Sequence, residues 1–186
     1  MVRVSPLIYF GVALIFATLI TFIDVVLNIH FLDIGDRVNY LARAISGAFY
    51  YDNFSLLTFF ISLRDEPLFS LIFFFMDQLG IPDVASVRTI IFLSTLTTFF
   101  VMLHNGRIPL YAFTFLLFFD WFISNYINSL RLALASSIFL LGWFYANGYK
   151  KKLIFALTPL IHYNFFIVLG LVWLESVLRK MKMSVD

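Results

Sequence analysis

An arginine, a histidine and a glutamate stand within or beside the apolar segments of this chain. Arg131 opens one long apolar run, and His162 lies inside the next one. Glu66 directly precedes Pro67 at the start of a third apolar run. Because ionisable side chains are rare in hydrocarbon and usually functional there, these three residues are the first candidates for a site.

Arg131 has the chemistry of a phosphate ligand. It follows a polar stretch, and Asn128 or Ser129 is placed to cap the helix that Arg131 begins. Helix N-termini attract phosphate, and a guanidinium adds a fork of donors that matches phosphate oxygens. Ala135, one turn further on, lets a lipid-linked phosphate or a neighbouring helix approach closely. The simpler alternative is an interfacial arginine whose charge reaches lipid headgroups.

His162 follows Pro159, which frees a backbone carbonyl and is expected to kink the helix in mid-span. An imidazole beside such a kink can donate to a phosphate or move a proton near neutral pH. Tyr163 and Asn164 extend the polar patch. A hydrogen-bonded structural histidine explains the same residues equally simply.

The candidate carboxylates lie in a long segment, residues 24–66. Glu66 is suited to act as a general base or to orient a sugar hydroxyl. Asp33, Asp36 and Asp52 compete for the same role. The structural alternative for Glu66 is an acid stabilised at a helix N-terminus, with proline in the first turn.

Composition predicts an integral membrane protein. Of 186 residues, 62% are hydrophobic and only 13% are charged, whereas a soluble domain has roughly 45–50% and about 25%. The net charge of +2 gives no reason to expect nucleic acid as a partner. The absence of cysteine excludes disulfides and thiolate metal sites. Three scattered histidines predict no metal site, and no cofactor motif is present.

We predict an all-α, polytopic transmembrane bundle of five or six spans that forms a single domain, residues 1–186. A crossing needs about 20 apolar residues. The candidate spans are residues 5–23, 85–103, 108–124, 131–147 and 153–174. Residues 67–80 form either a short sixth span or a re-entrant segment. The first span is expected to be a retained signal anchor.

Residues 24–66 are predicted to form an outer loop. Apolar residues at near-helical spacing predict a juxtamembrane amphipathic helix from Val38 to Phe49, whose apolar face carries Val38, Leu41, Ala42, Ile45 and Phe49. A structured connecting loop is the alternative. Lysine and arginine counts do not settle the orientation, because Lys150–Lys152 and the basic C-terminal residues favour opposite placements.

The order of these elements resembles the EpsG family of bacterial polysaccharide polymerases, which is related to Wzy-type O-antigen and capsule polymerases. Glu66-Pro67-Leu68-Phe69 is similar to the family's Glu-Pro-x-Phe element. Arg131 to Ala135 is similar to its Arg-Gln-x-x-Ala element, with Leu132 in place of glutamine. His162 to Asn164 is similar to its Phe-His-x-Ser element, with asparagine in place of serine. An acidic and aromatic loop precedes them, with Asp33, Asp36, Tyr40, Tyr51 and Asp52.

The resemblance covers residues 30–175 and implies a glycosyl transfer at the outer face of the bacterial inner membrane. The substrates would be sugar repeats on undecaprenyl pyrophosphate. It implies that Arg131 stabilises the departing pyrophosphate with help from His162, and that Glu66 deprotonates the acceptor hydroxyl. It leaves substrate binding to Asp33, Asp36, Asp52, Asn128 and Asn164. No cofactor is expected.

Two other functions fit the same sequence. Family members are commonly longer, so this chain is expected to be either their N-terminal half or a shortened relative. A shortened relative that lost part of the site would be a non-catalytic membrane partner of a polymerase or of a chain-length regulator. Alternatively, Asp120 and His162 would serve a proton or substrate path in a small transporter of lipid-linked sugar.

Overall fold

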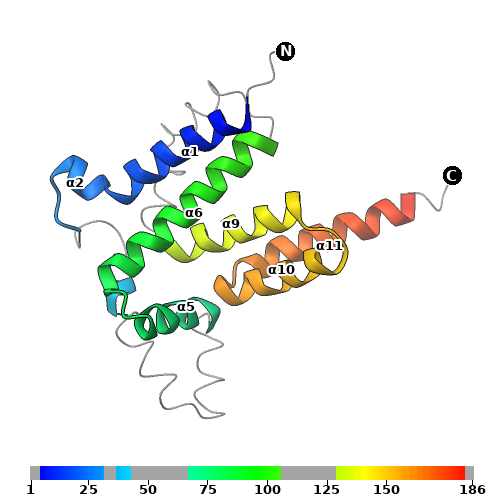
Figure 1. Ribbon diagram of the computed structural model, residues 1–186. Coiled ribbons are helices and arrows are strands. Elements are labelled where there is room, and N and C mark those ends of the chain that lie inside the picture. The colour runs from blue at the N-terminus through cyan, green and yellow to red at the C-terminus, as the bar shows by residue number, and fades with distance from the viewer. Residues whose placement is uncertain (1–4, 32–36, 43–66, 106–128, 183–186) are drawn as a thin grey trace, which may run out of the picture.

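The computed structural model describes residues 5–31, 37–42, 67–105 and 129–182. All regular structure within these ranges is helical, which confirms the all-α class (Figure 1). Residues 37–42 are helical. The other helices are α1 (Pro6–Thr21), α2 (Ile23–Leu27), α5 (Pro67–Gln78), α6 (Asp83–Asn105), α9 (Leu130–Tyr145), α10 (Gly148–Ile161) and α11 (Phe165–Lys182).

Helices α1 and α6 pack side by side in opposite directions. The Phe16 and Phe99 rings meet edge to face, with their centroids 6.0 Å apart. At the far end of the pair, Nη1 of Arg88 lies 3.5 Å from the carbonyl oxygen of Thr21. Helix α1 ends there because Phe22 leaves the helical conformation. The end of α1 is therefore fixed against the beginning of α6.

Helices α6, α9 and α10 pack against one another in chain order. The Tyr145 hydroxyl lies 3.2 Å from Nδ1 of His104, so α6 and α9 end close together. Helix α10 returns against α9, with the Phe139 and Phe155 rings stacked 4.7 Å apart. At the Arg131 end of the bundle, as we name it, α1 and α10 end while α6 and α9 begin (Figure 1). The turn between α9 and α10 defines the opposite Lys151 end.

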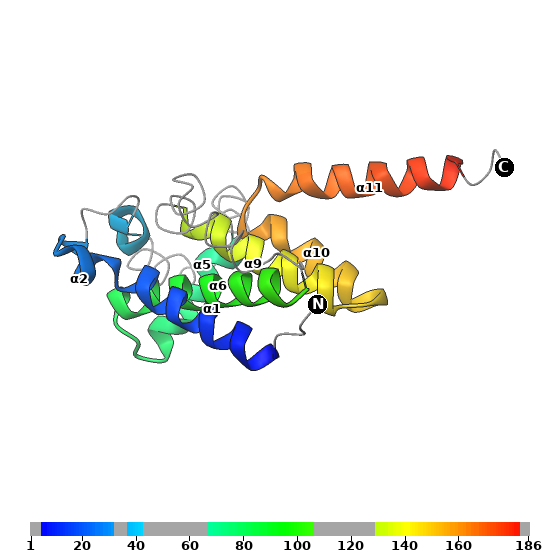
Figure 2. The same ribbon diagram turned by 90° about the horizontal axis from the view of Figure 1, so that it is seen from above.

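The apolar run 153–174 does not form one helix. Helix α10 stops at Ile161, His162 is extended, and α11 begins at Phe165. Pro159 lies inside α10 and lacks the N–H that would donate to the carbonyl of Phe155, but the helix continues past it to Ile161. The predicted mid-span kink at Pro159 is therefore wrong, since the chain reverses instead. Figures 1 and 2 both show α11 running back toward the Lys151 end.

Helix α5 contacts both α10 and α6. It begins at Pro67, as the Glu66-Pro67 pair predicts, because proline suits the first turn of a helix. A turn through Gly80, whose φ is +70°, leads from α5 to α6. Helix α5 is therefore a helix of its own, joined to the beginning of α6 at the Arg131 end.

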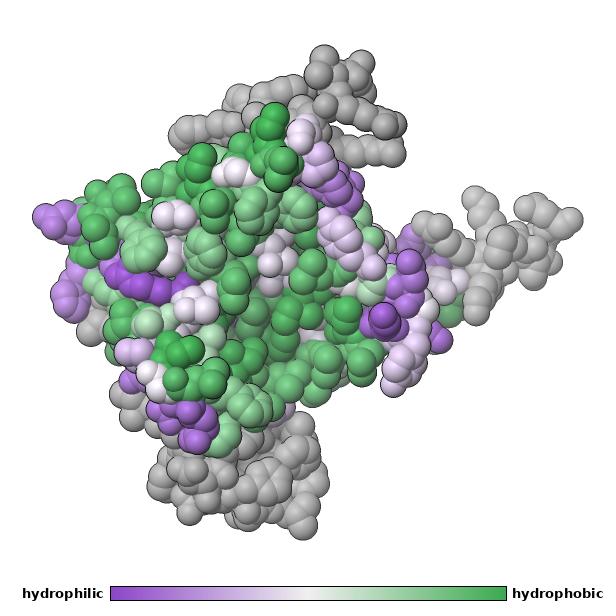
Figure 3. Space-filling model, viewed as in Figure 1, coloured by the Kyte–Doolittle hydropathy of each residue, from purple (hydrophilic) through white to green (hydrophobic). Residues whose placement is uncertain are grey.

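The bundle interior contains many small polar side chains, and much of its exterior is apolar. Helix α6 buries Ser86, Ser94, Thr95 and Thr98. The Ser94 hydroxyl donates to the carbonyl oxygen of Ile91 at 3.1 Å, within its own helix. Figure 3 shows apolar side chains over the middle of one face and hydrophilic ones toward its edges. Small side chains of this kind allow helices to approach closely.

Within the described ranges, α6 is the one helix both long and apolar enough to cross a bilayer. Shorter apolar helices cover Pro6–Thr21, Pro67–Gln78, Leu130–Tyr145 and Phe165–Leu178.

Candidate functional site

The first backbone donor of α9 is capped by a side chain from a distant part of the chain. The N–H of Leu130 donates to the Tyr40 hydroxyl at 2.9 Å, and both residues are buried. The first N–H groups of a helix have no partner within the helix. Of the two predicted caps, Ser129 stands at the N-cap position but makes no capping hydrogen bond with its side chain, and Asn128 lies outside the described residues. Tyr40 takes the capping role at Leu130.

The Tyr40 ring also binds α5 to this end of the bundle. It meets the Phe69 ring edge to face at 5.8 Å, and Phe69 meets Phe73 in the same way at 5.1 Å. The helical segment 37–42 therefore buries Arg37 and Tyr40, whereas Val38 is exposed. Of the predicted apolar face, Val38 and Ala42 are exposed and Leu41 is half-buried, while Ile45 and Phe49 lie outside the described residues, so the juxtamembrane amphipathic helix stays a prediction.

Arg131 is the second residue of α9, directly after the N–H that Tyr40 holds. Its side chain is half-buried. Ala135, one turn further along, is fully buried. Other parts of the protein therefore pack closely against Ala135, which agrees with the interpretation that its small side chain lets a neighbouring helix approach. The Arg131 side chain therefore extends from the first turn of α9, at the end of the helix where the dipole is positive.

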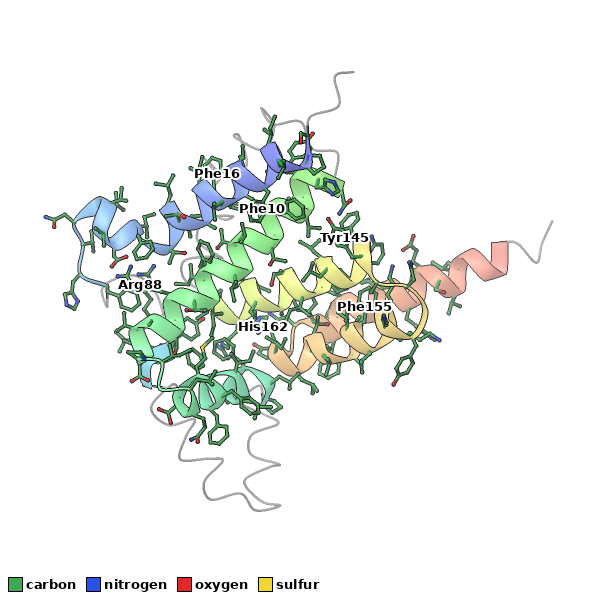
Figure 4. All side chains as sticks on the ribbon, in the orientation of Figure 1. Phe10, Phe16, Arg88, Tyr145, Phe155 and His162 are labelled. Atoms are coloured by element: carbon green, nitrogen blue, oxygen red, sulfur yellow. The ribbon has the colours of Figure 1, made fainter. Side chains whose placement is uncertain are left out.

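Arg131 lies in the first turn of α9, and His162, labelled in Figure 4, ends α10. Because α9 and α10 run in opposite directions (Figure 1), the two residues lie at the same end of the bundle. The backbone N–H of His162 donates to the Thr158 carbonyl at 3.0 Å. Its side chain is buried, and its ring centroid lies 5.2 Å from that of Tyr163. Tyr163 and Asn164 are exposed in the turn before α11.

The structure thus places two predicted catalytic residues, Arg131 and His162, at one end of the bundle. Asn164 lies in the exposed turn that follows His162. The other predicted site residues lie outside the described ranges, namely Asp33, Asp36, Asp52, Glu66 and Asn128. Pro67, the neighbour of Glu66, begins α5, and α5 contacts α10.

A cluster of three charged residues was missed by the sequence interpretation. Nη2 of Arg88 donates to Oδ2 of Asp24 at 2.6 Å. Nη1 of Arg37 lies 3.7 Å from Oδ1 of the same carboxylate. Asp24 and Arg37 are buried, and the Arg88 side chain is 20% exposed. The available signal was a charged residue, Arg88, inside a predicted span.

Aromatic rings surround the two guanidinium groups of this cluster. The Phe31 ring centroid lies 4.5 Å from Cζ of Arg37 and 5.0 Å from Cζ of Arg88. Burial lowers the pKa of Arg37 from its ordinary value, while the Asp24 carboxylate opposes the shift and the Arg88 charge adds to it. Arginine nevertheless stays charged in proteins. The cluster therefore holds two positive charges and one negative charge.

Within the described part of the chain, no three histidine, aspartate or glutamate side chains gather where they would hold a metal ion. Comparison of the whole chain with protein-family models, curated proteins and solved structures finds no match.

Proposed function

We propose that this protein is a polytopic membrane glycosyltransferase of the polysaccharide-polymerase type. It would join sugar repeats carried on undecaprenyl pyrophosphate at the outer face of the bacterial inner membrane. The observation that carries the proposal is the hydrogen bond from Leu130 to Tyr40. It ties the loop segment, α5 and the beginning of α9 to one end of the bundle, and His162 lies at that same end.

The distribution of side chains supports placement in a bilayer. On α1, the exposed positions include Leu7, Ile15 and Leu19, while Ala13, Ala17 and Thr21 face the interior. Large apolar side chains outside and small or hydroxyl-bearing ones inside are typical of membrane helices, whose interfaces form by close approach. A soluble monomer rarely exposes apolar patches beyond a few hundred Å².

The two ends of the bundle support one orientation. Lys150, Lys151 and Lys152 open α10 at the Lys151 end. Because α11 turns back, its last residues run toward that end as well (Figures 1 and 2). Both basic groups then favour the cytoplasmic side, which removes the conflict that a continuous span 153–174 would create. The Arg131 end would face outward.

The chemistry proposed for the site is a displacement at the anomeric carbon of the donor sugar. The acceptor hydroxyl oxygen forms the new glycosidic bond while the bond to the pyrophosphate oxygen breaks. The hydroxyl proton passes to Glu66 or to one of the loop aspartates. The electron pair of the broken bond leaves with the pyrophosphate. Arg131, with His162, stabilises that departing charge.

The test is polymerisation of purified lipid-linked repeats by the protein in proteoliposomes. Arg131→Ala should lower the rate by at least about 100-fold, since one donor to a developing oxyanion contributes that much. Arg131→Lys should recover little, because an ammonium lacks the planar fork. Lys152→Ala, an exposed change at the opposite end, should leave the rate unchanged. Full activity of both Arg131 variants at normal expression would reject the assignment.

A second candidate function is that of a non-catalytic membrane partner of a polymerase. Helix α11 favours it, because Phe166, Ile167 and Trp173 are exposed along a helix that makes few contacts with the bundle. Co-purification of a larger polymerase, with the isolated protein inert on lipid-linked sugar, would favour this function over the first.

A further inference from the structure

The cluster of Asp24, Arg37 and Arg88 has one positive charge more than it can neutralise. Asp24 is bound closely by Arg88, whose Nη1 also faces the Thr21 carbonyl. Arg37 interacts with Asp24 more weakly, because its Nη1 lies 3.7 Å from Oδ1. That distance is within ion-pair range but too long for a hydrogen bond. Charges removed from water are normally paired and hydrogen-bonded. Hydrogen bonding is incomplete at two places in the cluster, at the Arg37 guanidinium and at Oδ1 of Asp24, which faces it.

The Arg37 side chain pairs with Asp24 only at ion-pair distance. Within the described residues, its Nε, Nη1 and Nη2 atoms have no hydrogen-bond acceptor, although the side chain is fully buried. One face of the guanidinium lies against the Phe31 ring, so a ligand must meet the edge that carries the N–H groups. That edge is a planar fork, which matches two oxygens of one tetrahedral anion.

The helical segment 37–42 links this cluster to the beginning of α9. Arg37 and Tyr40 are three residues apart and therefore lie on one side of the helix. Arg37 faces the Asp24 carboxylate, while the Tyr40 hydroxyl accepts from Leu130. The Arg37 guanidinium therefore lies at the Arg131 end, where α1 ends and α6 begins.

We propose that Arg37, backed by Arg88, binds a phosphoryl group carried by a membrane lipid. The group would accept hydrogen bonds from the Arg37 fork and neutralise the excess charge that Asp24 leaves. Its source would be either a phospholipid headgroup or the pyrophosphate of a lipid-linked sugar. The second source rests on the proposed function, and the anion site itself does not.

The test follows the thermal unfolding of the purified full chain in detergent by tryptophan fluorescence. Samples that contain inorganic pyrophosphate are compared with samples in sodium chloride of equal ionic strength, so that general screening of charges is the same in both. The wild type should show a saturable rise in Tm. Lys152→Ala, an exposed change at the opposite end of the bundle, should keep the rise, and Arg37→Met should lose most of it. Arg37→Lys should need at least about ten times more pyrophosphate for the same rise, because it lacks the fork.

The change in Tm that Arg37→Met causes without added pyrophosphate is a second readout. Arg37→Met removes the uncompensated charge and leaves the contact between Asp24 and Arg88 in place, so its Tm should equal or exceed that of the wild type. A lower Tm would make Arg37 a structural ion-pair partner and overturn the proposal. An equal pyrophosphate response in the wild type and Arg37→Met, or no response in either, would also overturn it.

The source is distinguished in phosphatidylcholine nanodiscs that contain phosphatidic acid or undecaprenyl pyrophosphate. If both lipids stabilise the protein and the effect depends on Arg37, the site binds phosphorylated lipid headgroups in general. Stabilisation by undecaprenyl pyrophosphate alone assigns the lipid carrier. These arms measure binding and not polymerisation, so an inactive protein that passes them refutes the proposed reaction without refuting the site. A lack of Arg37-dependent stabilisation by either lipid refutes the lipid-bound source.

Discussion

The Tyr40 hydroxyl accepts a hydrogen bond from the backbone N–H of Leu130 at 2.9 Å, although the two residues are 90 positions apart. This contact replaces a local helix cap with one supplied by another segment. The position of Arg131 therefore depends on the position of the helical segment 37–42. The same segment carries Arg37 into the buried charge cluster.

Tyr40→Phe is expected to destabilise the protein by about 1–3 kcal/mol, since it leaves the buried Leu130 N–H without an acceptor while keeping the ring contact to Phe69. Thermal unfolding of the purified protein measures the change. Tyr163→Phe removes an exposed hydroxyl and should change stability by less than about 0.5 kcal/mol. Equal effects of the two changes would show that the hydrogen bond contributes nothing.

Gly142→Ala is expected to force α9 and α10 apart. A Cβ atom at Gly142 would lie 2.6 Å from Cγ2 of Ile154 and 3.1 Å from Cε1 of Phe155. Overpacking of this kind costs about 1–3 kcal/mol. Gly170→Ala in α11 meets no atom within 4 Å and should stabilise its helix by up to about 1 kcal/mol. Opposite signs of the two Tm changes are the expected outcome.

Asp24→Asn should be strongly destabilising, because it leaves the guanidinium groups of Arg37 and Arg88 without their carboxylate. Removing one partner of a buried ion pair costs about 3–5 kcal/mol. Adding Arg88→Met should recover part of the loss, which a double-mutant cycle measures. Asp77→Asn, at an exposed position, is the control. Additive effects at positions 24 and 88 would contradict the coupling.

Trp173 is expected to contact lipid acyl chains, because it is 68% exposed on α11. In a variant with Trp121→Phe and Trp143→Phe, brominated acyl chains should quench the remaining fluorescence strongly. Aqueous iodide should quench it weakly. Strong quenching by iodide would place α11 in water and remove one support for a membrane bundle.

Much of the helix content could be predicted from the sequence. The predicted segments 5–23, 85–103 and 131–147 match α1, α6 and α9 closely. Each of these helices corresponds to one long local run of apolar residues, so the hydropathy pattern is sufficient to predict it. The apolar run 153–174 led to a wrong prediction of one continuous helix, because hydropathy alone does not record that the chain turns at His162 between α10 and α11.

The candidate site could be predicted only in part. Arg131 and His162 stand out as polar residues beside apolar runs, and the packing of α9 against α10 places them at one end. The Tyr40 cap and the pairing of Asp24 with Arg88 each join segments more than 60 residues apart. Such contacts depend on how the helices pack, and neither residue type nor local spacing encodes them.

The side of the membrane on which the Arg131 end lies tests the central claim most directly. The chain has no cysteine, so Ser129→Cys and Asn147→Cys each create a unique thiol at opposite ends of the bundle. In intact cells, a membrane-impermeant thiol reagent should label position 129 and leave position 147 unlabelled until the membrane is permeabilised. Labelling of position 147 alone would place Arg131 in the cytoplasm and contradict an outward-facing polymerase.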